Sequence, residues 1–345
     1  MIETNIAAFN NLIEDFSTGS DELVENGKRY IKTNTAEKEW LQKLVIENSL
    51  RILSSVTIIL IKYEDFSYIA FIGNKLDEVN LDTHVLQNEP LNAGLITVLL
   101  AENFLKLSKS TLLDFYNDIL FQHKEPEYKG HDYEDIVPFL NTINFYQIPK
   151  DSVLSNNNLY KIATYLIAID KQYLILDFSN VVINLFADLS LMGSEKIEFE
   201  FFLNSLLSSN FKHSFLELYR LVERIFPLNY LKELHVAVTT AIPFLSFAAL
   251  VEEKIGWRPR EEDALEKIFE KTSSSTTTLF LAVFQNPQAV EVISCSKQFY
   301  KLRNSIVHFR ANHTEPILNQ IQWNLIIQGT LELIDQHYSE NSTFL

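Results

Sequence analysis

The sequence predicts an α+β protein, in which a mixed α/β domain over residues 1–190 is followed by an all-α helical bundle over residues 191–345. Two observations lead to this division. Segments rich in Val, Ile and Thr, separated by short turns, lie before residue 191, and such segments are typical of strands. After residue 191, apolar residues recur at three- and four-residue steps, which is the spacing of amphipathic helices. A chain of 345 residues is long enough for two domains.

The first half is expected to combine helices with two hairpins. Residues 52–61 are rich in β-branched side chains and predict a strand that pairs with residues 68–72 across a short turn. A second hairpin is expected to join residues 160–169 to residues 173–178. Helices are predicted at residues 3–16, 35–50, 94–107 and 110–122, with Thr35 and Ser110 as N-caps and a polar loop at residues 124–133.

The second half is expected to be helical. The predicted helices are residues 197–207, 211–226, 228–253, 261–271, 279–284, 288–311 and 316–338, with Gly or Pro at several of the breaks. The polar run at residues 273–278 predicts either a loop or a helix cap. Residues 236–251 form the longest apolar run, but its 16 residues fall short of the ~20 needed to span a bilayer. This run therefore predicts a buried helix.

The charge of the chain argues against broad, non-specific binding of nucleic acid. The formal net charge is −16, and residues 1–190 hold most of it, with 15 Lys and Arg against 27 Asp and Glu. Any contact with RNA must therefore be local.

A single cysteine excludes an internal disulfide, and the N-terminal residues lack the basic and apolar regions of a signal peptide. We expect a cytoplasmic protein that makes no contact with a membrane.

One amphipathic helix near the C-terminal end carries the most informative side chains. One stripe of this helix is apolar and is expected to be buried, and its members are Cys295, Phe299, Leu302, Ile306 and Phe309. The opposite face is expected to carry the polar residues Lys297, Lys301, Asn304, His308 and Asn312.

Three side chains of this helix suit the cleavage of RNA. A histidine side chain in general changes charge near neutral pH, so the histidine of this helix, His308, can take a proton from a ribose 2′-OH or give one to a leaving oxygen. The guanidinium of Arg303 can stabilise the charge that develops on a phosphate. On an ideal helix Asn304 lies about 40° from His308, so it can orient the imidazole or contact phosphate, whereas Arg303 lies about 140° away. Arg303 can therefore join His308 only by curling round the helix or through a second copy of the helix.

The spacing of Arg303, Asn304 and His308 resembles the Arg-(four to six residues)-His signature of HEPN-domain ribonucleases, such as the Apea-like and abortive-infection proteins. Residues 214–226 resemble the early helix of these domains, and the resemblance covers about residues 195–345 only. It implies a metal-independent endoribonuclease that cleaves RNA by 2′-OH attack and leaves a 2′,3′-cyclic phosphate. It also implies a site shared across a homodimer, no cofactor, and a prokaryotic defence or toxin effector whose residues 1–190 respond to a regulatory partner or ligand.

Further residues are expected to assist the motif. Glu223, on the early helix, is a candidate partner for the motif, and the alternative is an ion pair with Arg220 or Arg224 on its own helix. The candidates for binding RNA are Lys297, Lys301, Arg310 and Asn312. The alternative function for the whole chain is a non-catalytic helical dimerisation or adaptor protein that binds a protein or nucleotide partner.

We expect a second copy of the chain to pack on Tyr300 and Val307. They lie seven residues apart, between the apolar stripe and the polar face and next to Arg303. Packing of this strip on its symmetry mate would bring two arginines and two histidines into one cleft. The alternative is that both residues pack within the same chain, against residues 316–338.

Overall fold

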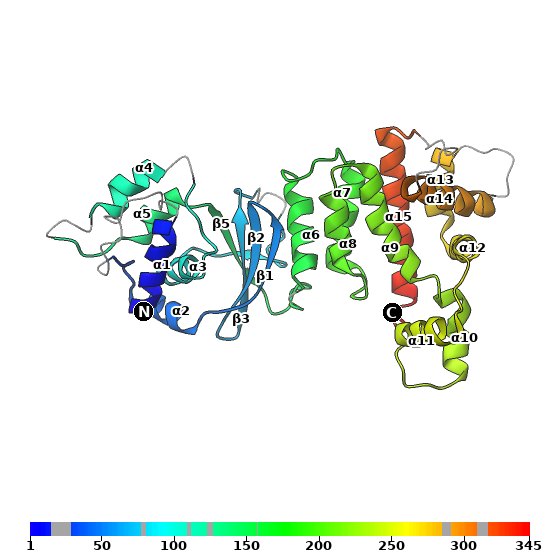
Figure 1. Ribbon diagram of the computed structural model, residues 1–345, viewed down its shortest axis with the longest axis horizontal. Helices are drawn as coiled ribbons and strands as arrows, with labels where there is room; N and C mark the ends of the chain where they lie inside the picture. Colours follow the sequence, from blue (N-terminus) through cyan, green and yellow to red (C-terminus); the bar gives the residue numbers. More distant parts are fainter. Residues whose placement is uncertain are drawn as a thin grey trace. The chain divides into compact units, whose positions relative to one another are not determined.

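The structure of the protein is a computed structural model that describes residues 1–14, 29–76, 81–108, 112–122, 127–156, 158–284, 291–308 and 317–345 (Figure 1). Its contacts divide the chain into unit 1, Met1–Leu159, and unit 2, Tyr160–Leu345. Unit 1 holds an antiparallel sheet with helices, and the described part of unit 2 is mostly helical, so the predicted α+β class is confirmed. The sequence predicts a boundary between residues 190 and 191, whereas the contacts divide the chain between residues 159 and 160, where a helix begins.

Unit 1 is built on a five-stranded antiparallel sheet in the order β1-β2-β3-β5-β4. The strands are β1 Val45–Leu53, β2 Val56–Tyr63, β3 Phe66–Gly73, β4 Gln87–Asn88 and β5 Thr142–Ile148. The hairpin of β2 and β3 closes where Tyr63 pairs with Phe66, and Glu64 adopts a positive φ of 53° in the turn. This hairpin confirms the predicted pairing of residues 52–61 with residues 68–72, except that residues 52 and 53 belong to β1.

Helices cover one face of this sheet in unit 1 (Figure 1). The helical elements are α1 Ile2–Glu14, α2 Thr35–Lys43, α3 Ala93–Ala101, α4 Leu112–Phe115, a π-helical turn Tyr116–Leu120, α5 Tyr133–Ile136 and a 3₁₀ turn Val137–Phe139. Phe9 of α1 and Ile96 of α3 share one core with Ile59 and Ala70 of the sheet. Both strands are apolar at successive positions, so it is the alternating direction of side chains along a strand that points Ile59 and Ala70 toward the helices.

Helix α2 is shorter than predicted at its C-terminal end. It begins where expected, but its N-cap is Asn34, whose side chain accepts the backbone N–H of Glu37 at 3.0 Å, and not Thr35. It stops at Lys43 because Leu44 takes an extended conformation and the β-branched Val45 starts strand β1. The segment predicted as one helix, residues 35–50, therefore forms helix α2 and the first part of strand β1.

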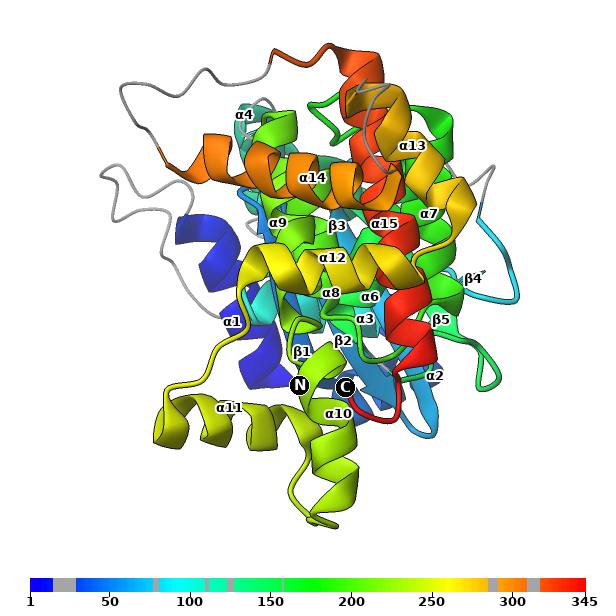
Figure 2. The ribbon, with the colours of Figure 1, turned by 90° about the vertical axis from the view of Figure 1, so that its right-hand side faces the viewer.

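Unit 2 is a bundle in which the long C-terminal helix α15 packs against α7, α9 and α13 (Figure 2). Its helices are α6 Leu159–Asp170, α7 Asn180–Met192, α8 Phe199–Leu206, α9 Phe211–Arg224, α10 Leu228–Ala237, α11 Phe244–Ile255, α12 Glu261–Lys271, α13 Ser274–Phe284, α14 Glu291–Val307 and α15 Gln320–Glu340. Helix α14 packs against α9, α12 and α13. Three neighbouring helices therefore surround the segment that carries the predicted motif.

Two sequence predictions for unit 2 are wrong. The predicted hairpin over residues 160–178 is replaced by helix α6, because an apolar run that is buried on several sides has no clear period of two or of 3.6. The predicted helix over residues 228–253 breaks into α10 and α11 between Thr239, which has a φ of 46°, and Pro243. This region is not buried as expected, since Val236 is 58% exposed and Val238 is 47% exposed.

The polar run of residues 273–278 forms the cap and the first turn of α13 rather than a loop. The hydroxyl of Ser273 accepts the backbone N–H of Thr276 at 3.2 Å, and the helix begins at Ser274, five residues before the predicted start at residue 279. Within the described part of the chain, no helix combines the length and the apolar character that crossing a bilayer requires.

Candidate functional site

Helix α14 presents the predicted motif in its last turns. Cys295, Phe299 and Leu302 are buried, as the apolar stripe predicts, and Ile306 is half-buried. Lys297 and Lys301 are exposed on the opposite side, while Phe309 lies outside the described residues. The amphipathic pattern therefore fixes which way this helix faces.

Phe299 anchors α14 to its neighbours. Its ring lies 5.2 Å from that of Phe215 on α9, 5.5 Å from that of Phe269 on α12 and 5.3 Å from that of Phe280 on α13, as measured between ring centres. All three pairs are edge-to-face, which is a favourable geometry for aromatic rings. Arg303 follows Phe299 by four residues and therefore lies on nearly the same side of α14.

The guanidinium of Arg303 is held by groups from three helices. Its Nη2 donates to the Oε1 of Glu223 on α9 at 2.9 Å, and its Nη1 donates to the side-chain oxygen of Asn304 at 2.9 Å. The same Nη1 lies 3.6 Å from the Oε2 of Glu261 on α12. The guanidinium carbon also lies 5.5 Å from the ring centre of Tyr219, a cation–π distance. Only 17% of the Arg303 side chain is exposed, so these neighbours restrict the orientations that its guanidinium can adopt.

The predicted partnership of Glu223 with the motif is present as a direct ion pair with Arg303. The alternative, a pair with a neighbouring arginine on α9, is not what the structure shows. Arg220 instead pairs with Glu217, and Arg224 pairs with Glu198. Burial raises the pKa of Glu223 above its usual value, and the charge of Arg303 offsets this rise only in part.

Two members of this cluster were missed by the sequence analysis. Tyr219 is almost fully buried, and its hydroxyl has no hydrogen-bond partner among the described residues. Burial and the charge of Glu261 raise its pKa, so the phenol stays protonated at neutral pH. Tyr219 lies four residues before Glu223, and this helical spacing is a signal that would have found it. Glu261 begins an acidic first turn of α12, and nothing in the sequence near it indicates a contact with Arg303.

His308 lies just after the end of α14 and is exposed. Its backbone N–H donates to the carbonyl of Asn304 at 2.9 Å, which continues the last helical turn. The side chain of Asn304 contacts Arg303 and not His308, so the expected orientation of the imidazole by Asn304 is not observed. Among the described residues, no hydrogen bond or ion pair joins Arg303 to His308. Arg310 and Asn312, both expected to bind RNA, lie outside the described residues.

Replacing Glu223 with glutamine should raise the free energy of unfolding. The difference between the variant and the wild-type protein should grow as the pH rises. The pKa of Glu223 is raised in the folded protein from 4.5, so its ionisation costs more there than in the unfolded chain. Its contribution to stability is thus fully present below pH 4.5 and is lost as the pH rises through the raised pKa. Glutamine does not ionise and can still accept the bond from Arg303. Urea unfolding of both proteins from about pH 4 to 7 should show the advantage of the variant growing and then levelling off. An advantage that shrinks with pH would show that attraction to Arg303 outweighs burial.

The cluster supplies an oriented cation flanked by acids, and an exposed histidine follows just after the end of α14. Such groups can bind a phosphate and transfer a proton. In the described part of the chain, no three His, Cys, Asp or Glu side chains gather closely enough to hold a metal ion. Comparison of the chain with protein-family models, with curated proteins and with solved structures found no match.

Proposed function

We propose that unit 2 is a metal-independent endoribonuclease of the HEPN class that acts as a homodimer. One observation carries this proposal: Arg303 is held in a fixed position near the end of α14 by Glu223 and Glu261, while His308 follows just after the end of this helix and is free of side-chain partners among the described residues. We further propose that the activity serves a prokaryotic defence or toxin effector in which unit 1 is the regulatory part.

In the proposed reaction, His308 removes the proton from a ribose 2′-OH. The 2′-oxygen then forms a bond to phosphorus while the bond from phosphorus to the 5′-oxygen breaks, which leaves a 2′,3′-cyclic phosphate. A second histidine, from the partner copy, protonates the leaving 5′-oxygen. Arg303 donates hydrogen bonds to the non-bridging phosphate oxygens, where negative charge develops.

The two glutamates prepare Arg303 for this role by fixing its orientation in advance. A guanidinium that is already held loses less freedom when a phosphate binds than one that is mobile. Glu261 is the looser of the two acidic partners, at 3.6 Å against 2.9 Å for Glu223. A phosphate that reaches the guanidinium would therefore displace Glu261 before Glu223.

Replacing Arg303 with lysine should lower the cleavage of RNA in excess EDTA by about 10²–10³-fold. Lysine keeps the positive charge near Glu223 and Glu261, but it lacks the planar fork that binds two phosphate oxygens at once. The measurement is the initial rate on a labelled RNA. The 2′,3′-cyclic phosphate ends are identified because alkaline phosphatase leaves them blocked to ligation, whereas polynucleotide kinase, which removes the cyclic phosphate, makes them ligatable. Arg258→Lys is the matched control, because Arg258 pairs with Glu252 on the surface of unit 2, and its side chain is 75% exposed. An absolute requirement for a divalent metal would overturn the proposed reaction class.

A second candidate function is a non-catalytic binding module, which two observations favour. Arg303 already has two carboxylate partners within its own chain, so its role can be structural. Helices α10 and α11 also expose several large apolar side chains, namely Leu234, Val236, Leu250 and Ile255. On this alternative, the wild-type protein does not cleave RNA, and Arg303→Lys changes only its stability.

A further inference from the structure

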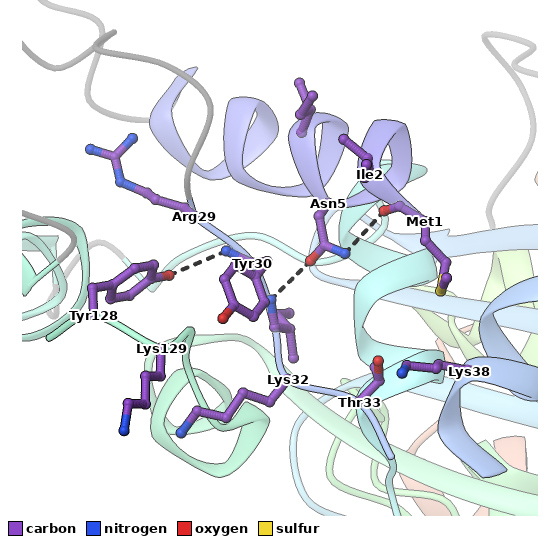
Figure 3. A pocket seen from close by; sticks show the side chains of 12 residues that line it. Met1, Ile2, Asn5, Arg29, Tyr30, Lys32, Thr33, Lys38, Tyr128 and Lys129 are labelled. Carbon is purple, nitrogen blue, oxygen red and sulfur yellow. Dashed lines mark hydrogen bonds between the residues drawn. The ribbon is translucent and has the colours of Figure 1, made fainter. Parts of the chain in front are cut away.

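Unit 1 contains a pocket that the proposed ribonuclease does not use. It has a volume of about 730 Å³ and lies between α1, residues 29–33, the start of α2 and residues 128–129 (Figure 3). Binding sites for small molecules usually have volumes of roughly 300–1,000 Å³. The pocket is therefore large enough for a small organic ligand.

The charge of this pocket is opposite to that of the chain. It is lined by Arg29, Lys32, Lys38 and Lys129, and no acidic side chain lines it among the described residues, although the whole chain carries a net charge of −16. Lys38 and Lys129 have no ion-pair partner in the described part of the chain. Lys32 pairs with Asp132 at 2.8 Å, but both side chains are about half exposed, and such surface ion pairs contribute little to the stability of a protein. An anion can therefore compete for all three lysines.

One side of the pocket is apolar and aromatic. Tyr30 is 42% exposed, and its ring lies 5.9 Å from that of Tyr128 in an edge-to-face arrangement. Ile2, at 78%, and Ile6, at 41%, are also exposed at the pocket and add apolar surface to this side. Figure 3 shows Tyr30, Lys32 and Lys129 among the side chains that line the pocket.

The backbone that carries Tyr30 is fixed in place. Its N–H donates to the hydroxyl of Tyr128 at 3.2 Å, and the N–H of Ile31 donates to the side-chain oxygen of Asn5 at 2.9 Å (Figure 3). Gly130 has a φ of +91°, and a Cβ there would lie 2.4 Å from the Tyr30 ring. Because Gly130 has no side chain, the Tyr30 ring can occupy this space. The aromatic surface is therefore in place before any ligand binds.

We propose that this pocket binds a nucleoside polyphosphate, with the phosphates at the lysines and the base stacked on Tyr30. An inorganic anion would use the cations but not the exposed aromatic and apolar side. A neutral aromatic compound would use that side but not the cations. A nucleotide uses both, because phosphates bind lysine ammonium groups and any base stacks on an aromatic ring.

Calorimetric titration of the full chain tests the ligand class. The probes are ATP and GTP, with adenosine, inorganic tripolyphosphate and a peptide of glutamates as comparisons. We expect at least one of the two nucleotides to bind roughly tenfold more tightly than adenosine or tripolyphosphate, because each comparison lacks one half of the contacts. Binding of tripolyphosphate as tight as that of both nucleotides would overturn the role of Tyr30. Preferential binding of the peptide, or no binding of either nucleotide, would overturn the proposed ligand.

Variants of the pocket test its location. The double variant Lys38→Glu with Lys129→Glu should weaken nucleotide binding by at least about tenfold, and Tyr30→Ala should weaken the binding of nucleotide but not of tripolyphosphate. Lys196→Glu is the control, since Lys196 is an exposed lysine of unit 2. If the double variant does not fold, as judged by circular dichroism, single Lys38→Gln and Lys129→Gln variants replace it. Unchanged binding by folded variants of the lysines would overturn the site.

Discussion

Replacing His308 with alanine should lower the cleavage of RNA in excess EDTA by about 10²–10⁴-fold and leave the melting temperature unchanged. The expected loss of activity is large because one side chain moves the proton at the reacting 2′-oxygen. The stability should not change, because His308 is exposed and its only contact in the described structure is made by its backbone N–H. A loss of activity without a loss of stability is the combination that distinguishes a catalytic group from a structural one.

His84→Ala provides the control for this experiment. His84 is also an exposed histidine, but it lies in unit 1 and has no relation to the motif. Both variants change the same chemical group, so any contaminating nuclease should act equally in the two preparations. Equal cleavage by His308→Ala and by His84→Ala would therefore show that another group, or another protein, cuts the RNA.

The parts of the site that the sequence predicted are those with a helical period. The spacing of Cys295, Phe299 and Leu302 predicted the buried stripe of α14, and the phase of that stripe placed Lys297 and Lys301 in solvent. Local periodicity decides these features, because a helix buries its apolar face whatever its neighbours are. For the same reason, the boundaries of α12 were predicted correctly.

The parts that the sequence did not predict depend on contacts between distant segments. Glu261 reaches Arg303 only because α12 packs against α14, and neither helix encodes this pairing by itself. Residues 45–53 form a strand because β2 pairs with them, although the sequence predicts that the helix beginning at residue 35 continues to residue 50. The reverse error occurs at α6, where an apolar segment that reads as a strand is buried as a helix.

The separation of Arg303 from His308 connects the structure to the proposed dimer. The guanidinium turns into unit 2, toward α9 and α12, and His308 stands exposed after the last turn of α14. The two groups that act on one phosphate in the proposed reaction are therefore not brought together by any contact among the described residues of one chain. A second copy of α14, related by a two-fold axis, would place a histidine beside each arginine.

Replacing Val307 with glutamate should convert the protein to monomers and abolish RNA cleavage at the same time. Val307 is 46% exposed on the last turn of α14, beside His308, and on the proposed dimer this side chain is covered by the partner copy. A buried glutamate without a partner is costly enough to break an interface, and the two copies of the charge would also repel each other. Light scattering should show a fall from twice the chain mass of 40.0 kDa to the chain mass itself.

Val238→Glu is the matched control, because Val238 is 47% exposed but lies at the end of α10, far from the motif in the sequence. This variant should remain dimeric and active. If Val238→Glu gives monomers and Val307→Glu does not, the copies meet through α10 and α11, and the motif of one chain does not face that of the other. If Val307→Glu is a stable monomer that still cleaves RNA, one chain must supply every catalytic group. Arg303 would then have to leave Glu223 and Glu261 and reach round α14 to the phosphate that His308 serves.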